Sequence, residues 1–178
     1  MFNTPISWTL LFDTSRDGLS MTRFESKVLG YQSPTVSIVE FNDQRSFVLG
    51  VDSPWLLSPQ NWGGLNCFLI SVKPAFKKFA SGPNFIFFNT KLRSLDNGII
   101  VGNVKNPLLK ISGDFDNLHH MEVWGSGHDS ALSAQQKQKA WEKVQAEKYS
   151  KVALPGKWEE NPDKAILDMA DRKIFFQQ

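Results

Sequence analysis

The stretch His119–Asp129 reads HHMEVWGSGHD and holds all three histidines of the chain, with two acids and a tryptophan. Imidazole and carboxylate groups are common metal ligands and general acid–base catalysts, so this stretch is the first candidate for chemistry. In a strand, however, successive side chains point to opposite faces, and the adjacent His119 and His120 would diverge. Nothing in the spacing matches a zinc pattern. We therefore expect neither a metal site nor a cofactor here.

The same residues fit a strand at the edge of a packed sheet. One face of that strand would carry His119, Met121 and Val123, and the other His120, Glu122 and Trp124. In this interpretation Trp124 is buried, and Glu122 is satisfied by a neighbouring backbone or arginine group.

The stretch Asp13–Gly18, DTSRDG, is the second candidate, because two carboxylates flank a hydroxyl pair and an arginine. Carboxylates act as acid and base and arginine holds an anion, so a hydrolytic site could use this set. The same residue types also favour a tight loop, pinned by a pair between Arg16 and either Asp17 or Glu122. We favour the structural interpretation and assign no catalytic residue. The sequence contains no GxSxG elbow, P-loop, HExxH or dinucleotide fingerprint.

Two further segments are weaker candidates. Asn61–Asn66, NWGGLN, has two glycines but no following helix or lysine, so it predicts a turn rather than a phosphate cradle. Cys67 is the only cysteine and lies in the apolar run CFLISV, which indicates a small buried hydrophobe. A single cysteine excludes an internal disulfide and favours a reducing compartment such as the cytosol.

Composition limits the possible partners. The chain has 178 residues, of which 41% are hydrophobic and 21% charged, enough for one compact domain and an appendage. Its net charge of +2 gives no strong field toward nucleic acid or an anionic membrane. No apolar stretch approaches the roughly 20 residues that span a bilayer, and we identify no signal peptide. We expect no nucleic acid partner and no direct membrane insertion.

The elements that would position these residues are mostly strands. Fourteen Phe and six Trp fall in short runs between turn residues. Alternation in WTLLF predicts Trp8, Leu10 and Phe12 on one face, and Thr35–Phe41 with Arg45–Val51 predicts a hairpin. Further strands are predicted at 66–72, 75–80, 84–88, 97–102, 108–112 and 120–124. This spacing, without regular helices between the strands, predicts a mostly β fold, a two-sheet antiparallel β-sandwich.

Helices are expected in two places. Ser20 can cap a short helix that Gly30 ends. After Gly127 the chain becomes rich in Gln, Lys and Glu. We therefore predict a sandwich domain at 1–127 and a helical extension at 128–178, with helices at about 131–152 and 162–176. The second of these begins at an Asn-Pro-Asp cap and carries an apolar stripe.

The apolar side chains of this extension are the predicted partner-binding residues. They are Trp141, Val144, Ile166, Leu167, Met169, Ala170, Ile174, Phe175 and Phe176. An amphipathic helix commonly lies in a groove of its partner. The alternative is that this helix folds back onto its own sandwich.

Four segments together resemble the TLD (TLDc) domain, between about Trp8 and Gly125. They are LLFDTSRDGLSMTRF, the hairpin that ends in Gly50 and is followed by Pro54-Trp55, the run NCFLIS, and MEVWG. The structural motif residues are Ser15, Arg16, Asp17, Gly18, Glu122, Trp124 and Gly125. The segment Asn97–Asp116 is shorter than the usual pattern of the family.

The resemblance implies a two-sheet β-sandwich that binds other proteins. TLD proteins are linked to protection against oxidative stress and to the vacuolar proton-pumping ATPase, and no catalytic residue set is established for them. In the lysosomal, mTOR-associated member a helix after the domain helps to grip that pump. We expect a non-enzymatic protein that binds peripheral-sector subunits of the pump and regulates it. It would lie in the cytoplasm, held through its partner beside vacuolar, lysosomal or other endomembranes.

Two other functions stay open. One is a structural subunit of another large assembly. The other is an enzyme that protects against oxidative stress, in which Arg16, Asp17, Glu122 and a histidine would have to converge in an accessible cleft.

Overall fold

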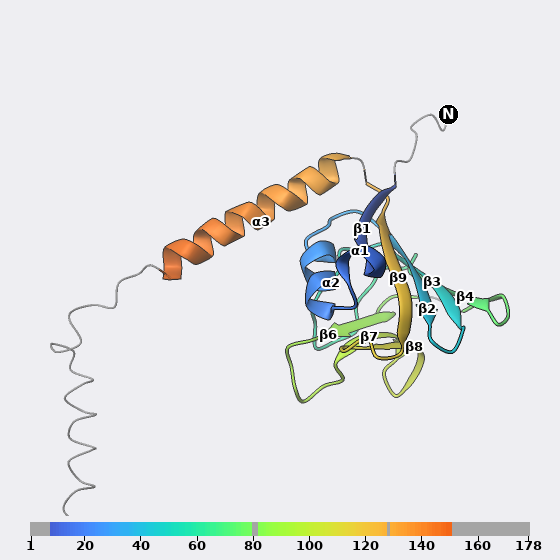
Figure 1. Ribbon diagram of the computed structural model, residues 1–178. Helices are drawn as coiled ribbons and strands as arrows, with labels where there is room; N and C mark the ends of the chain where they lie inside the picture. The colour runs from blue at the N-terminus through green and yellow to red at the C-terminus, as the bar shows by residue number, and fades with distance from the viewer. Residues whose placement is uncertain (1–7, 80–81, 128, 151–178) are drawn as a thin grey trace, which may run out of the picture. The chain divides into compact units, whose positions relative to one another are not determined.

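The computed structural model describes residues 8–79, 82–127 and 129–150, which form a mostly β domain with two antiparallel sheets, as predicted (Figure 1). The larger sheet has the strand order β1–β9–β2–β3–β4–β5 and the smaller one β6–β7–β8. The strands of the larger sheet are β1 (Thr9–Asp13), β9 (Leu118–Gly125), β2 (Thr35–Phe41), β3 (Ser46–Val51), β4 (Phe68–Lys73) and β5 (Lys77–Lys78). Those of the smaller sheet are β6 (Ile86–Asn89), β7 (Gly98–Asn103) and β8 (Asn106–Ser112). The helices are α1 (Thr14–Asp17), α2 (Met21–Val28) and α3 (Asp129–Ser150).

Strand β9 lies inside the larger sheet, between β1 and β2, so the expected edge position was wrong. Side-chain periodicity reports which face of a strand is buried, but not which distant strand it pairs with. The pairing sets Asp13 opposite Glu122 and Leu10 opposite Trp124. The two motifs of the sequence, SRDG and EVWG, are thereby brought to one place.

Two β-bulges change the expected faces. In β1 the register shifts between Leu10 and Phe12, so Leu11 and Phe12 are both buried while Trp8 is 49% exposed. The strict alternation predicted for WTLLF was therefore wrong. A second shift, between Glu40 and Phe41 of β2, leaves His119 of β9 exposed beside a buried Met121. A bulge adds one residue to one strand of a pair, and side-chain alternation reverses there.

Aromatic side chains join α2 to both sheets. Phe24 of α2 meets Phe12 of β1, Phe88 of β6 and Trp55 edge-on, with ring centroids 5.2 to 5.6 Å apart. All four side chains are buried. The Ser20 hydroxyl caps the helix as predicted, by accepting a hydrogen bond from the backbone of Arg23. The short amphipathic helix is therefore held by one large side chain between the sheets.

The predicted hairpin is confirmed, because β2 and β3 pair antiparallel across a polar turn. Gln44 in that turn has φ +69°, the left-handed region that tight turns require. Of the described residues in the strand predicted at 75–80, Lys77–Lys78 form β5, which pairs with Ile70 and Ser71 of β4. The residues between β4 and β5 form an exposed hairpin tip.

The chain divides into two compact units, Met1–Lys139 and Ala140–Gln178. The division falls within α3, further along the chain than the boundary after Gly127 that the sequence indicated. Ala131 and Leu132 pack against the hydrophobic core, and Gln135 is buried. The first turns of α3 therefore belong to the sandwich unit.

Candidate functional site

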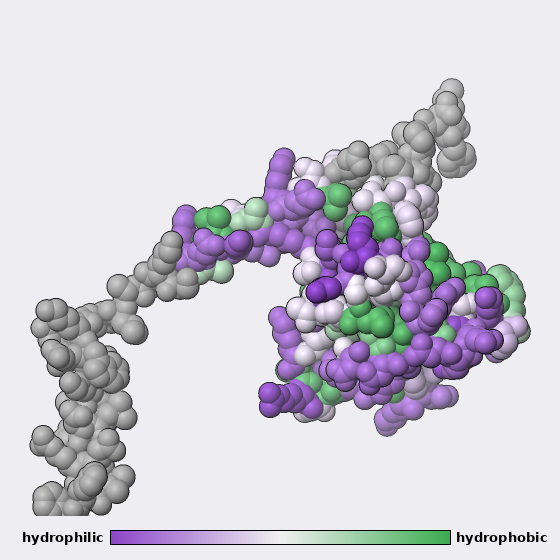
Figure 2. Space-filling model, viewed as in Figure 1, coloured by the Kyte–Doolittle hydropathy of each residue, from purple (hydrophilic) through white to green (hydrophobic). Residues whose placement is uncertain are grey.

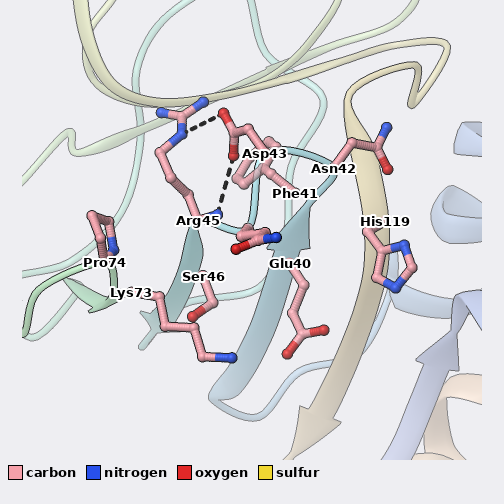
Figure 3. Close-up of a pocket in the computed structure, with 10 residues that line it drawn as sticks. Glu40, Phe41, Asn42, Asp43, Arg45, Ser46, Lys73, Pro74 and His119 are labelled. Atoms are coloured by element: carbon pink, nitrogen blue, oxygen red, sulfur yellow. Dashed lines mark hydrogen bonds and ion pairs between the residues drawn. The ribbon is translucent and has the colours of Figure 1, made fainter.

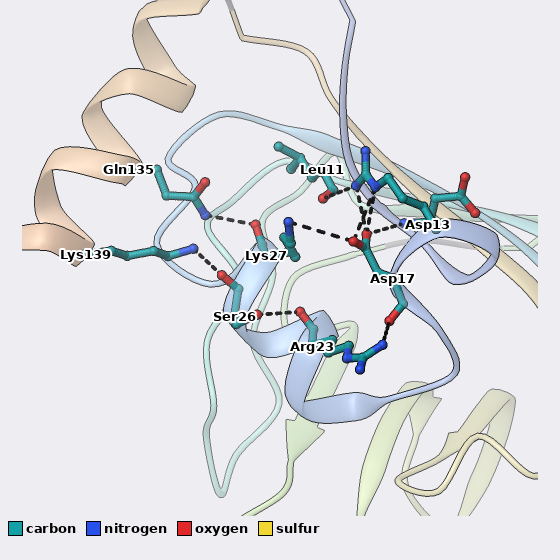
Figure 4. A network of polar contacts seen from close by, with 9 residues as sticks. Leu11, Asp13, Asp17, Arg23, Ser26, Lys27, Gln135 and Lys139 are labelled. Atoms are coloured by element: carbon teal, nitrogen blue, oxygen red, sulfur yellow. Dashed lines mark hydrogen bonds and ion pairs between the residues drawn. The ribbon is translucent and has the colours of Figure 1, made fainter. Parts of the chain in front are cut away.

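The SRDG motif forms a compact polar network after β1 (Figure 4). Asp13 caps α1 by accepting a hydrogen bond from the backbone N–H of Ser15 at 2.7 Å. The Asp17 carboxylate accepts one from Arg16 at 2.8 Å and another from the backbone N–H of Asp13 at 3.1 Å. Lys27 of α2 lies 3.8 Å from the same carboxylate. Of the two pairings expected for Arg16, the structure shows the one with Asp17.

Electrostatics hold this pair in its charged form. The hydrogen bond from Arg16 is the main cause that lowers the pKa of Asp17 below its ordinary value, and the bond from the Asp13 backbone adds to it. The same contact raises the pKa of Arg16. The Arg16 guanidinium also donates to the Leu11 carbonyl at 3.2 Å. Asp17 therefore ties β1, α1 and α2 together.

A second chain of hydrogen bonds runs along β9. The Thr14 hydroxyl accepts from the backbone N–H of Met121 at 3.0 Å and lies 2.9 Å from His120 Nδ1. On the other side of the ring, His120 Nε2 lies 3.2 Å from Glu122, and the Trp124 indole donates to the same carboxylate at 2.8 Å. A carboxylate can only accept, so the contact with Glu122 fits the tautomer with its proton on Nε2, to which the Thr14 hydroxyl can donate at Nδ1. Two expectations were therefore wrong. Glu122 contacts side chains of its own strand rather than a backbone or arginine group, and Trp124 is only partly buried.

This chain of hydrogen bonds has one chemical capability. Ser15 Oγ lies 3.3 Å from His120 Nδ1, and a hydroxyl beside an imidazole that contacts a carboxylate can exchange a proton. The convergence expected of Arg16, Asp17, Glu122 and a histidine is not formed, however. Arg16 and Asp17 pair with each other, whereas Glu122 accepts from His120 and Trp124. Within the described residues no group of three or more His, Cys, Asp or Glu side chains could hold a metal ion.

Gly125, the last residue of EVWG, is required by the packing of Tyr31. A Cβ atom at Gly125 would lie 2.4 Å from the buried phenol ring of Tyr31. The Tyr31 hydroxyl accepts a hydrogen bond from the backbone N–H of Gly127 at 2.9 Å. The phenol thus fixes the chain where it leaves the sheet toward α3.

Replacing Gly125 with alanine should destabilise the domain by about 1–3 kcal/mol, because the added methyl group overpacks against Tyr31. Urea unfolding followed by tryptophan fluorescence measures this change. Gly82→Ala is the control, since a Cβ there meets nothing within 4 Å. Equal unfolding midpoints for the two variants would contradict the proposed contact.

The glycine turn of NWGGLN binds an anionic group of the chain itself, the side-chain carboxylate of Asp52. The Asp52 carboxylate accepts hydrogen bonds from the backbone of Gly64 at 2.9 Å and of Asn66 at 3.0 Å. The Cys67 thiol donates to the same carboxylate at 3.1 Å. Burial raises the pKa of Cys67 to about 11, so the thiol is protonated at neutral pH. A turn, and a buried cysteine, are as predicted.

A cleft of about 630 Å³ lies at the β2–β3 turn, a place that no sequence pattern indicated (Figure 3). Its lining residues are Glu40, Phe41, Asn42, Asp43, Gln44, Arg45, Ser46, Lys73, Pro74 and His119. Arg45 is paired with Asp43 at 2.7 Å and lies over the ring of Phe41. The lining includes two acidic and two basic side chains, so neither sign of charge dominates the cleft. The lining does not include Ser15, His120 or Glu122. The hydrogen-bonded side chains along β9 therefore lie outside this cleft.

The start of α3 is fastened to the end of α2 (Figure 4). The buried Gln135 amide donates to the carbonyls of Lys27 at 3.0 Å and Leu29 at 2.8 Å. Lys139 donates to the Ser26 carbonyl. The last carbonyls of any helix lack partners within the helix, and here two side chains of α3 supply them. A glutamine in a polar helix gives no sequence signal of this role.

We expect Gln135→Ala to destabilise the domain by about 1–3 kcal/mol, because two carbonyls lose their donor. Thermal unfolding measures the loss. The control is Gln136→Ala, one residue further on the same helix, where the side chain is exposed. If the two variants unfold at the same temperature, Gln135 does not fasten the helix.

Only part of the predicted partner-binding set lies in the described residues. Trp141 is 64% exposed and Val144 is 48% exposed. The surface of α3 is otherwise mainly hydrophilic (Figure 2). The remaining predicted residues lie outside the described residues; they are Ile166, Leu167, Met169, Ala170, Ile174, Phe175 and Phe176. No helix in the described segments is long and apolar enough to cross a membrane.

The sandwich, with its first and last strands joined and a polar network at their junction, defines a class of mostly β domains. A model of the TLDc domain matches residues 2–144. The chain therefore belongs to the TLDc domain family. This match includes the part of α3 that carries Trp141 and Val144.

The chain is also similar to several known proteins. It is 27% identical to oxidation resistance protein 1 of Xenopus tropicalis over 89 residues. This alignment covers 49% of this chain and 10% of that protein. It is 29% identical to human nuclear receptor coactivator 7 over 92 residues, an alignment that covers 51% of this chain and 10% of that protein. Restriction of telomere capping protein 5 of Meyerozyma guilliermondii is 26% identical to this chain over 245 aligned residues. This alignment covers 89% of this chain and 41% of that protein. The chain thus spans about a tenth of the length of the first two relatives.

Proposed function

We propose that this chain is a non-enzymatic TLDc interaction protein that binds the vacuolar proton-pumping ATPase through its C-terminal helical region. Its place would then be the cytoplasmic side of vacuolar or lysosomal membranes, held there by subunits of the peripheral sector. Membership of the TLDc family supports a binding role.

The observation that carries this proposal is that α3, which is hydrogen-bonded to α2 near its start, bears two exposed hydrophobic side chains. Gln135 and Lys139 attach α3 to the sandwich, and the next residues of the same helix carry Trp141 and Val144, both about half exposed or more. An exposed tryptophan is a common anchor of protein interfaces. A segment that is already helical costs less to order on binding than an unstructured one.

The polar network supports a structural rather than a catalytic role for the motif residues. Each charged group of SRDG and EVWG contacts a partner within the domain, and the contacts of Asp17 join β1, α1 and α2. The motif would then maintain the shape of a binding domain.

Double replacement of Trp141 and Val144 by alanine tests the proposal. We expect association with the pump, measured by co-purification of the tagged full chain from a native lysate, to fall at least about tenfold, because both side chains would lose buried area. Gln136→Ala on the same helix is the matched control. Deletion of residues 157–178 tests the remaining predicted contacts in the same assay.

Two results would overturn the proposal. Undiminished association after both changes would exclude the helical region as the contact. Recovery of a different large assembly, without pump subunits, would favour a structural subunit of that assembly.

A further inference from the structure

The hairpin between β4 and β5 ends in an exposed aromatic side chain. Phe76 is 77% exposed, which is the largest value among the large hydrophobic side chains of the described residues. The hairpin extends from the edge of the larger sheet (Figure 1). Phe76 contributes nothing to the core there, because Phe79 is the hairpin residue that packs against it. A single exposed hydrophobic side chain is normal on a protein surface, so the case for an external contact depends on what surrounds Phe76.

Lysines surround this tip. Lys73, Lys77 and Lys78 are all exposed, and residues 72–79 contain no acid. Across the described part of the chain these lysines form no ion pair within 4 Å, although the Lys77 ammonium lies 5.1 Å from the centre of the Phe79 ring. At the base of the hairpin, Glu40 and Asp43 line the cleft together with Lys73. The anion-attracting surface is therefore confined to residues 73–78, the Phe76 tip.

We propose that the Phe76 tip binds the surface of a membrane that contains anionic phospholipids. An aromatic ring enters the interface between headgroups and acyl chains, while flanking lysines contact the headgroups with their ammonium groups. The hairpin extends from the edge of the sheet (Figure 1), and the cleft at its base holds both acidic and basic side chains, so nothing there selects an acidic peptide. A bilayer surface deforms around such a tip and needs no groove.

The expected strength is modest. Each lysine close to an anionic leaflet favours binding by about fivefold, so the two at Lys77 and Lys78 contribute about 25-fold. Insertion of the Phe76 ring contributes about tenfold or more. Membrane contact of this size is reversible and assists a second attachment rather than replacing one. The net charge of +2 does not reveal this site, because it averages over the whole chain.

Vesicle co-sedimentation with the full chain tests the tip without any protein partner. We expect binding to phosphatidylcholine vesicles that contain phosphatidylserine, weaker binding at high salt, and little binding to phosphatidylcholine alone. The double variant Lys77→Glu, Lys78→Glu should lose at least about 25-fold in partitioning. Phe76→Ser should lose about tenfold.

Leu65→Ser is the matched control, because Leu65 is 74% exposed in a different loop. It should bind like the unchanged protein. Equal binding to both vesicle types, or equal losses for Phe76→Ser and Leu65→Ser, would overturn the proposal. Absence of vesicle binding, with loss of a protein partner by the same variants, would show that the tip is a protein contact instead. Pump association is a separate measurement, so this test can fail while the proposed function stands.

Discussion

Replacement of Trp55 by alanine should lower the free energy of unfolding by about 3–5 kcal/mol, a larger effect than we expect from any of the other single substitutions. The indole is buried, and it lies edge-on to Phe24, Trp62 and Phe88 at centroid distances between 5.2 and 5.9 Å. Its removal opens a cavity between the sheets that rigid neighbours cannot fill. Because domains of this size are stable by only about 5–15 kcal/mol, much of the protein would unfold at moderate temperature.

Two further variants separate packing from hydrogen bonding at this site. Trp55→Phe keeps most of the ring but removes the 2.8 Å hydrogen bond from the indole to the Thr35 hydroxyl, so we expect a smaller loss of about 1–3 kcal/mol. Trp141→Ala is the control for tryptophan loss as such, since Trp141 is 64% exposed. Guanidinium unfolding measures all three. A Trp141 variant as unstable as the Trp55 variant would contradict the assigned core.

Asp17→Asn should destabilise the domain by about 1–3 kcal/mol at neutral pH, because Arg16 and the Asp13 backbone lose a charged acceptor. The direction of the pH effect follows from the pKa. The folded state lowers the pKa of Asp17 below its ordinary value of 3.8, so the unfolded chain binds the proton more tightly. The stabilisation is therefore complete above the unfolded pKa and is lost as the pH falls through the folded pKa.

Unfolding curves of the unchanged protein and the Asp17→Asn variant, measured from neutral to acid pH, test this prediction. The two should differ most at neutral pH and converge in acid. Asp43→Asn is the matched control: Asp43 also pairs with an arginine, but its side chain is 54% exposed against 10% for Asp17. Solvent screens such a pair, so we expect little change. A difference for Asp17→Asn that stays constant with pH would contradict the assignment.

Several features follow from local pattern, and the sequence predicts them. The β2–β3 hairpin, the Ser20 cap and the burial of Cys67 each depend on residues within a few positions of one another. Four short segments, among them those that contain SRDG and EVWG, were sufficient to indicate the TLDc family. Local signals of this kind survive because turns, caps and alternation are properties of short segments.

The arrangement of the motif residues was decided by the tertiary structure. No spacing in the sequence shows that Glu122 accepts from His120 and Trp124, or that Arg16 pairs with Asp17 instead of Glu122. His120, Glu122 and Trp124 share one face of β9, as the alternation predicted, but the contact between Thr14 and His120 depends on the position of β9 beside β1. A one-residue shift in pairing reverses the face of every following side chain, and only the packed sheet fixes it.

The sequence by itself determined that this chain forms strands, where most of them turn, and that its composition changes after Gly127. Only the tertiary structure decided that Gln135 fastens α3 to α2, and that Phe76 stands exposed among lysines. The physical reason is the same in both cases. Side-chain type sets local conformation, whereas the contacts of a polar glutamine or a hairpin phenylalanine depend on which distant segment folding brings beside it.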